Sequence, residues 1–112
     1  MPNLQFNMAN IPLQTDEMQN LCICVKSFLQ KNEIKKAEEE ICYAMYLHPH
    51  ASAPHNLMGI LLEKLGDHTK AMQHFRVAID LDPTYLPAKE NLYTFAEFHV
   101  GGIQWNYGEN TQ

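Results

Sequence analysis

Residues 52–85, SAPHNLMGILLEKLGDHTKAMQHFRVAIDLDPTY, decide the fold because they repeat the stretch that precedes them. Residues 18–51, MQNLCICVKSFLQKNEIKKAEEEICYAMYLHPHA, align with them at an offset of 34 residues without an insertion. The identical pairs are Lys36/Lys70, Ala37/Ala71, Ala44/Ala78, Leu47/Leu81 and Pro49/Pro83. A fixed period in the range of 20–50 residues is typical of repeat proteins. The chain is therefore expected to contain two copies of one structural unit.

Each unit is predicted to form two helices, because apolar residues recur at helical spacing on both sides of a central break. In the first unit these residues are Leu21, Cys24, Val25 and Phe28, followed by Ile34, Ala37, Ile41, Ala44 and Met45. In the second unit they are His55, Met58, Gly59 and Leu62, followed by Ala71, Phe75, Ala78 and Ile79. The pattern predicts an all-α fold.

The break falls at the same place in both units. Asn32 and Gly66 occupy equivalent positions, and both residue types tolerate the left-handed conformation that ends a helix. An acidic residue follows each of them, where a negative charge suits the start of the next helix. Pro49 and Pro83 end the units, because proline cannot continue a helix interior.

Small residues recur in the second helix of each unit. A small side chain lets the partner helix approach closely, whereas a leucine at the same position would push the two helices apart. Gly59 is expected to serve the same purpose in the first helix of the second unit. The four alanines that recur at the 34-residue period are Ala37, Ala44, Ala71 and Ala78.

These residues resemble the tetratricopeptide repeat family, whose unit is a 34-residue helix–turn–helix. In the second unit the resemblance depends on Gly59, Gly66, Asp67, Ala71, Phe75, Ala78, Asp82 and Pro83. In the first unit it depends on Ala37, Ala44, Leu47 and Pro49, with Asn32 in place of the turn glycine. The resemblance implies an α-solenoid, a right-handed stack of antiparallel helix pairs with about five helices in all.

The expected organisation has five parts. Residues 1–15 form an extended arm, 16–51 the first helix pair and 52–85 the second. Residues 86–99 form a lone capping helix of the kind that covers the last repeat, and 100–112 form a tail. Leu4, Phe6 and Met8 alternate with polar residues in the arm, as Ile103, Trp105 and Tyr107 do in the tail. Two alternatives stay open for these ends: they lack fixed structure, or the tail packs beside Tyr93, Phe95 and Phe98.

The composition restricts the class of protein. Of 112 residues, 46% are hydrophobic and 19% are charged, as in an ordinary globular domain. Eight Lys and Arg residues against 13 Asp and Glu give a net charge of −5, which argues against a nucleic-acid partner. No apolar run approaches the roughly 18 residues that span a bilayer, and we expect neither a membrane partner nor a secretion signal. Three cysteines, an odd number, favour a reducing cytoplasm.

The sequence does not predict an enzyme. It contains no nucleophile elbow, no phosphate-binding glycine loop and no zinc-protease motif, so we expect no cofactor. Cys22 and Cys24 lie about 200° apart around a helix and cannot bind one metal together; we expect Cys24 in the core and Cys22 partly exposed. His48 and His50, which flank Pro49, form the best remaining metal candidate, but no third ligand accompanies them.

Two further histidines, His68 and His74, lie six residues apart on different helical faces and are expected at the solvated surface. With no complete set of ligands, no metal site is predicted.

The resemblance to tetratricopeptide repeats implies that the first helix of each pair lines a concave face. The expected partner-binding residues there are Cys22, Lys26, Gln30, Asn56, Ile60, Lys64, Glu90 and Thr94. Some family members grip the terminal carboxylate of a chaperone, but the positions used for that hold Cys22, Lys26, Leu57 and Pro87 here, and only Lys26 and nearby Asn91 could contribute. That activity is therefore not implied.

The expected function is that of a non-enzymatic interaction module, which binds a peptide or partner helix on the concave face. One alternative is a self-associating repeat protein, because two repeats bury little surface and stacking or helix swapping would extend the core. A second alternative is a metal- or thiol-dependent binding protein built on His48, His50 and the cysteines.

Overall fold

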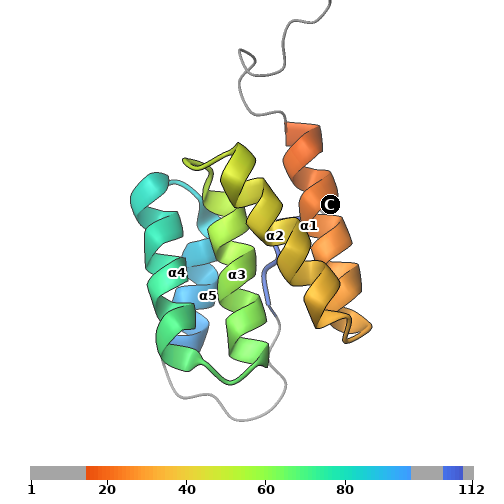
Figure 1. Ribbon diagram of the computed structural model, residues 1–112. Coiled ribbons are helices and arrows are strands. Elements are labelled where there is room, and N and C mark those ends of the chain that lie inside the picture. The colour runs from red at the N-terminus through yellow and green to blue at the C-terminus, as the bar shows by residue number, and fades with distance from the viewer. Residues whose placement is uncertain (1–14, 97–104, 110–112) are drawn as a thin grey trace, which may run out of the picture.

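The computed structural model describes residues 15–96 and 105–109. Within these ranges the chain forms five helices and no strand, so the prediction of an all-α fold is confirmed (Figure 1). The helices are α1 (Thr15–Gln30), α2 (Ile34–Leu47), α3 (Ser52–Lys64), α4 (His68–Leu81) and α5 (Leu86–Ala96). None of these helices is both long and apolar enough to cross a lipid bilayer. The predicted arm before residue 15 and the predicted end of the capping helix at 97–99 lie outside the described residues.

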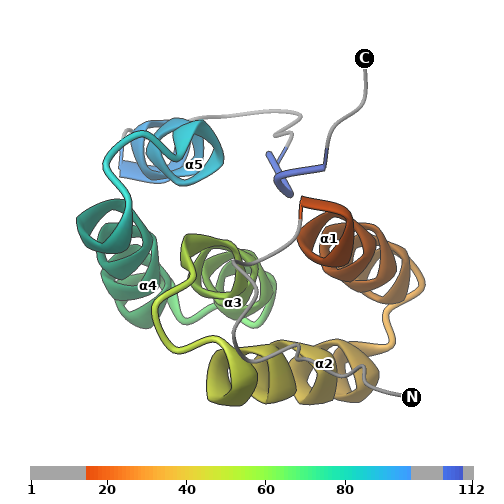
Figure 2. The same ribbon diagram turned by 90° about the horizontal axis from the view of Figure 1, so that it is seen from above.

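The helices pack as consecutive antiparallel pairs around α3. This helix contacts α1, α2, α4 and α5. Seen end-on, α2 and α4 lie on the outer side of the molecule, whereas α1, α3 and α5 surround its inner side (Figure 2). The isolated segment 105–109 lies on that inner side, between α1 and α5. This repeat-like arrangement gives the molecule two distinct faces.

The two turns inside the helix pairs have the same geometry. Asn32 and Gly66 adopt positive φ values of 61° and 86°. The N–H of Glu33 donates to the carbonyl of Phe28 at 2.7 Å, and the N–H of Asp67 donates to that of Leu62 at 2.9 Å. This is the Schellman arrangement, which satisfies carbonyls left free at a helix end. The equivalence of Asn32 and Gly66 inferred from the sequence therefore has a structural counterpart.

Small side chains allow α3 and α4 to approach closely. Ala71 and Ala78 are fully buried. A Cβ atom added to Gly59 would lie 2.5 Å from the ring of Phe75, which is also fully buried. The hydroxyl of Ser52 donates to the carbonyl of Ala78 at 2.7 Å and ties the start of α3 to the end of α4. Ala37 and Ala44 are buried between α2 and its neighbours.

The buried face of α1 differs from the prediction. Cys22 is 1% exposed, whereas Cys24 is exposed, the reverse of what we expected. Cys22, Val25 and Leu29 form the buried face, and Phe28 is only half-buried. The prediction was wrong because the spacing of apolar residues along α1 does not show which elements cover each side of the helix. The helix contacts both α2 and α3, and segment 105–109 covers the face that carries Cys22.

His55 on α3 and His74 on α4 form a stacked pair. Their ring centroids lie 5.3 Å apart with an interplanar angle of 24°, and their Nδ1 atoms are 3.1 Å apart. The expectation of a solvated His74 was therefore wrong, because α4 turns this side chain toward α3. Burial lowers the pKa of both imidazoles, and the neighbouring His74 lowers that of His55 further.

This pair predicts a pH-dependent stability. Because protonation of both rings is disfavoured in the folded protein, the two histidines contribute fully to the free energy of unfolding above the ordinary histidine pKa of 6.5. This contribution is lost as the pH falls through the lower pKa values of the two rings in the folded state. We expect the free energy of unfolding, measured by urea denaturation, to be lower at about pH 5 than at about pH 8. The double variant His55→Gln/His74→Gln should show a flatter pH profile. The control variant His50→Gln, which changes an exposed histidine, should keep the pH profile of the wild-type protein. An unchanged profile in the double variant would contradict the prediction.

Candidate functional site

On the inner side of the molecule, side chains of α1, α3 and α5 contact a later part of the chain, and we call this contact surface the inner groove. The chain's own residues Trp105–Glu109, here called the tail segment, lie in it (Figure 2). Trp105 is half-buried and packs against the hydrophobic core, while Tyr107 is only 8% exposed. The contacts with the tail segment therefore show how this surface holds a stretch of polypeptide.

A pair of buried asparagines holds the backbone of the tail segment. Asn56 on α3 and Asn91 on α5 are 0% and 1% exposed. The side-chain amides of Asn56 and Asn91 both donate to the carbonyl of Asn106, at 3.0 and 2.7 Å. The Oδ1 atom of Asn91 accepts the backbone N–H of Asn106 at 2.8 Å. Asn91 therefore recognises both backbone groups of one residue.

The two asparagines also orient each other. The Nδ2 of Asn91 donates to the Oδ1 of Asn56 at 2.8 Å. Each N–H of the Asn91 amide then has an acceptor, which a buried polar group requires for stability. Because N–H and C=O are common to nearly all residues, this pair binds the backbone of the residue between them without selecting its side chain.

Side chains at the edge of the inner groove recognise particular tail residues. Glu90 accepts the side-chain amide of Asn106 at 2.6 Å. The ammonium of Lys26 lies 2.7 Å from a carboxylate oxygen of Glu109 and 5.6 Å from the ring centroid of Tyr107. Lys26 therefore binds an acidic residue and an aromatic ring at the same time, through an ion pair and a cation–π contact.

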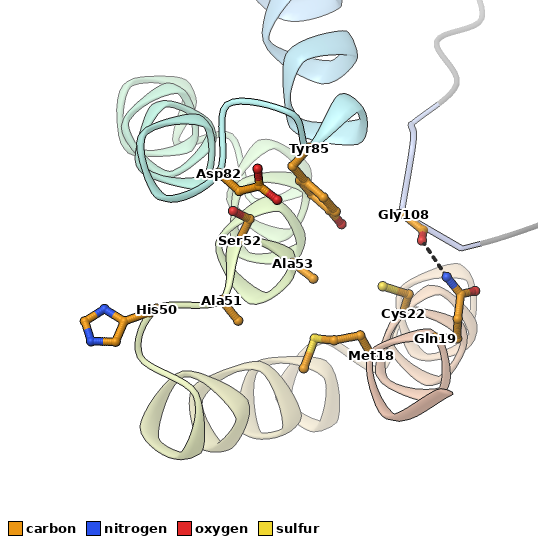
Figure 3. Close-up of a pocket in the computed structure, with 10 residues that line it drawn as sticks. All are labelled: Met18, Gln19, Cys22, His50, Ala51, Ser52, Ala53, Asp82, Tyr85 and Gly108. Carbon is orange, nitrogen blue, oxygen red and sulfur yellow. Dashed lines mark hydrogen bonds between the residues drawn. The ribbon is translucent and has the colours of Figure 1, made fainter. Parts of the chain in front are cut away.

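Gly108 fits where no other residue would. Its φ is +86°, and an added Cβ would overlap the hydroxyl of Tyr85 and lie 3.4 Å from the sulfur of Cys22. The carbonyl of Gly108 accepts a hydrogen bond from the Gln19 amide at 3.3 Å (Figure 3). Both the backbone conformation and the space around it therefore require glycine at this point.

A cleft of about 380 Å³ continues from Gly108 toward the start of α3, and the hydroxyl of Tyr85 points toward Cys22 and Gly108 beside it (Figure 3). The cleft is lined by Met18, Gln19, Cys22, His50, Ala51, Ser52, Ala53, Asp82, Tyr85 and Gly108. Burial, with a smaller contribution from Glu109, raises the pKa of the Cys22 thiol to about 12. Cys22 is thus a protonated thiol at neutral pH, in contrast to the thiolate that nucleophilic or metal-binding cysteines require.

The residues expected on the concave face fall into two groups. Cys22, Lys26, Asn56 and Glu90 lie against the tail segment, as the contacts above show. Of the other four, Ile60 is fully buried and belongs to the same core cluster as Tyr107, and Thr94 is half-buried on α5. Gln30 and Lys64 are exposed at the last residues of α1 and α3.

The sequence-based set omitted two residues that hold the tail segment, Asn91 and Gln19. A strict period of 34 places Glu90, rather than Asn91, opposite Asn56, so the asparagine pair was missed by one residue. The tail itself was expected either to lack fixed structure or to pack beside Tyr93. Residues 105–109 instead lie in the inner groove, and Tyr93 is 69% exposed. The side chain of Phe95 and the whole of Phe98 lie outside the described residues.

The candidate metal ligands do not come together in the described part of the chain. No three histidine, cysteine or carboxylate side chains among residues 15–96 and 105–109 are placed to share a metal ion. The Nε2 of His48 lies 3.5 Å from a carboxylate oxygen of Glu17, and His50 is exposed. Cys24 and Cys42 are exposed free thiols.

Comparison with known proteins returned no relative. No family model, no curated protein and no solved structure matches this chain.

Proposed function

We propose that this protein is a non-enzymatic protein-interaction module that binds a peptide segment in the inner groove. The observation that supports the proposal is that Asn56 and Asn91 together hydrogen-bond both the carbonyl and the N–H of Asn106. Side chains that bind backbone atoms in this way do not select the side chain of the residue that they hold. The edge residues Lys26 and Glu90 then add side-chain selectivity.

The helices support binding because they present the groove as a rigid surface. Asn56 and Asn91 are buried on α3 and α5, and their mutual hydrogen bond holds the two amides in place. A receptor that is already ordered loses little conformational entropy when its ligand binds. Most of the ordering cost then falls on the peptide, and the net affinity depends on how well the peptide fits.

The resemblance of the two units to tetratricopeptide repeats adds to the proposal, because that family binds peptides on the corresponding face.

A cytoplasmic setting, in which cysteines stay reduced, suits the free thiols of Cys22, Cys24 and Cys42. The raised pKa of Cys22 argues against a catalytic cysteine in the groove. The metal- or thiol-dependent alternative has no comparable support.

A peptide-display selection against the full chain tests this function. We expect the selected peptides to compete with one another for one site. Affinities are compared in the Glu109→Lys chain, whose tail segment has lost its ion pair with Lys26, because Asn56→Ala in the unaltered chain would weaken the binding of the tail as well. In that background Asn56→Ala should lower the affinity at least about tenfold, because a buried backbone carbonyl loses a donor. Lys35→Ala, an exposed change on α2, is the matched control and should leave affinity unchanged. Selected peptides that bind both variants equally well would place the binding surface elsewhere.

Self-association is the second candidate, and exposed apolar side chains on the first helix pair favour it. Tyr43, Tyr46 and Leu47 on α2 are 62%, 80% and 47% exposed, and Tyr43 and Leu47 line one cleft with Leu21 and Cys24 of α1. Exposed apolar clusters of this kind mark contact surfaces. A second copy could stack on this open end and lengthen the core.

This second candidate predicts a concentration-dependent mass in sedimentation velocity. Tyr46→Lys should lower the association constant at least about tenfold, because a buried tyrosine often dominates an interface. The control Tyr93→Lys alters an exposed aromatic residue on α5, away from that surface. A single monomeric species at every concentration would contradict self-association.

A further inference from the structure

We infer that the tail segment is a built-in ligand: it closes the inner groove in cis, and its residues reveal the peptide that the groove accepts in trans. That peptide carries the order Asn, aromatic residue, Gly, acidic residue, as residues 106–109 do. The inference rests on the proposed function and adds to it the class of ligand and the means of regulation.

Glycine is the strictest requirement of this pattern. The positive φ of Gly108 and the closeness of Tyr85 and Cys22 leave no room for a side chain. Tyr85 directly precedes α5 and Cys22 lies on α1, so two separate parts of the fold restrict this position to glycine (Figure 3). A peptide with alanine at this position must shift away from both side chains.

The neighbouring positions each have a matching group in the groove. The side chain of Asn106 donates to Glu90 and accepts the N–H of Gly108 at 2.9 Å, so it binds the groove and shapes the turn that brings glycine into place. The ring of Tyr107 is buried beside Lys26. Glu109 is paired with the same lysine and retains only 14% of its side-chain exposure. A basic residue at this last position would face Lys26.

Covalent linkage makes the tail segment an effective competitor. A ligand on a short tether experiences an effective concentration on the order of 1 mM. If the free peptide binds with a Kd of about 0.1 mM, the tail occupies the groove about nine-tenths of the time and weakens any competing peptide about tenfold. A partner must therefore bind more tightly than the tail, or the tail must first be released.

The test uses the full chain and a fluorescein-labelled peptide with the sequence of residues 103–112. Gly108→Ala and, independently, Glu109→Lys should each release the tail in the full chain. Trp105, the only tryptophan, reports this release through a red-shifted emission. Fluorescence anisotropy should then show the labelled peptide binding both variants about tenfold more tightly than it binds the wild-type chain. Glu39→Lys on the exposed side of α2 changes the net charge equally and should behave as wild type.

Peptide variants test the pattern itself. A labelled peptide with alanine in place of glycine should bind the Gly108→Ala chain at least about tenfold more weakly than the original peptide. The double variant Lys26→Glu/Glu109→Lys should restore closure of the groove, because the reversed charges pair again.

The outcomes separate the two proposals. Equal binding of the glycine and alanine peptides would overturn the sequence pattern and leave peptide binding intact. Equal binding of the labelled peptide to the wild-type and Gly108→Ala chains would overturn closure by the tail. If no peptide binds either opened chain while circular dichroism shows that its helices are intact, peptide binding in the groove is overturned as well.

Discussion

The Phe75→Ala variant is expected to lose about 3–5 kcal/mol of unfolding free energy, the usual cost of removing a buried phenylalanine ring. The ring is completely buried between α3 and α4 and fills the space left by Gly59. A domain of this size is commonly stable by only about 5–15 kcal/mol, so the variant should be close to unfolding at room temperature. Urea denaturation followed by circular dichroism measures the loss.

A double-mutant cycle identifies the cause. Gly59→Ala alone should cost about 1–3 kcal/mol, because its methyl group would lie 2.5 Å from the ring of Phe75. In the Phe75→Leu background the same change should cost less, since the smaller side chain leaves room. Tyr93→Ala, which removes a 69% exposed ring from α5, is the control and should change stability by less than about 0.5 kcal/mol. Strictly additive effects of Gly59→Ala and Phe75→Leu would show that the two positions do not share this contact.

The Asn91→Asp variant is expected to lose about 2–4 kcal/mol and to release the tail segment. The substitution keeps the shape of the side chain but removes both N–H donors, which bind Asn56 and the carbonyl of Asn106. A buried carboxylate would then face two oxygen atoms without a donor between them, which is costly in a fully buried position. The emission of Trp105 should shift to the red as the tail leaves the groove.

The control for this variant is Asn20→Asp, the same chemical change at an exposed position of α1. It should leave both stability and tryptophan emission within the error of the wild-type values, because exposed substitutions rarely exceed about 0.5 kcal/mol. If Asn91→Asp also leaves the emission unchanged, the asparagine pair does not hold the tail. If it destabilises the helices without a shift in emission, the tail stays bound through Lys26 and Gly108.

The helices and their turns could be predicted from local pattern alone. These features depend on residues that are close in the sequence, and they can be recognised without a structure. They are the helical spacing of apolar residues, the equivalence of Asn32 with Gly66, and the terminal prolines. The interior face of α1 could not be predicted in this way. Cys22 and Cys24 have similar chemistry, and which of them is buried depends on where α3 and the tail segment lie.

The candidate site was predicted only in part. Lys26 and Asn56 were assigned to the inner face by position in the repeat, and both contact the tail segment. Asn91 was not predicted as a site residue, because the period of 34 describes where helices recur in the sequence but not how each helix is rotated against its neighbours. The occupant of the groove could not be inferred, since the alternation of apolar and polar residues does not indicate which surface buries the side chains of Trp105 and Tyr107.

By itself, then, the order of residues determined that this chain forms helices in pairs, where each pair turns, and which small side chains let the pairs nest. Each of these properties arises from interactions within a few residues or from one fixed interval. Only the tertiary structure decided that residues 106–109 return to lie against α1, α3 and α5. Those contacts join residues some 15 to 89 positions apart, and they depend on the shape of a groove that exists only after the helices have packed.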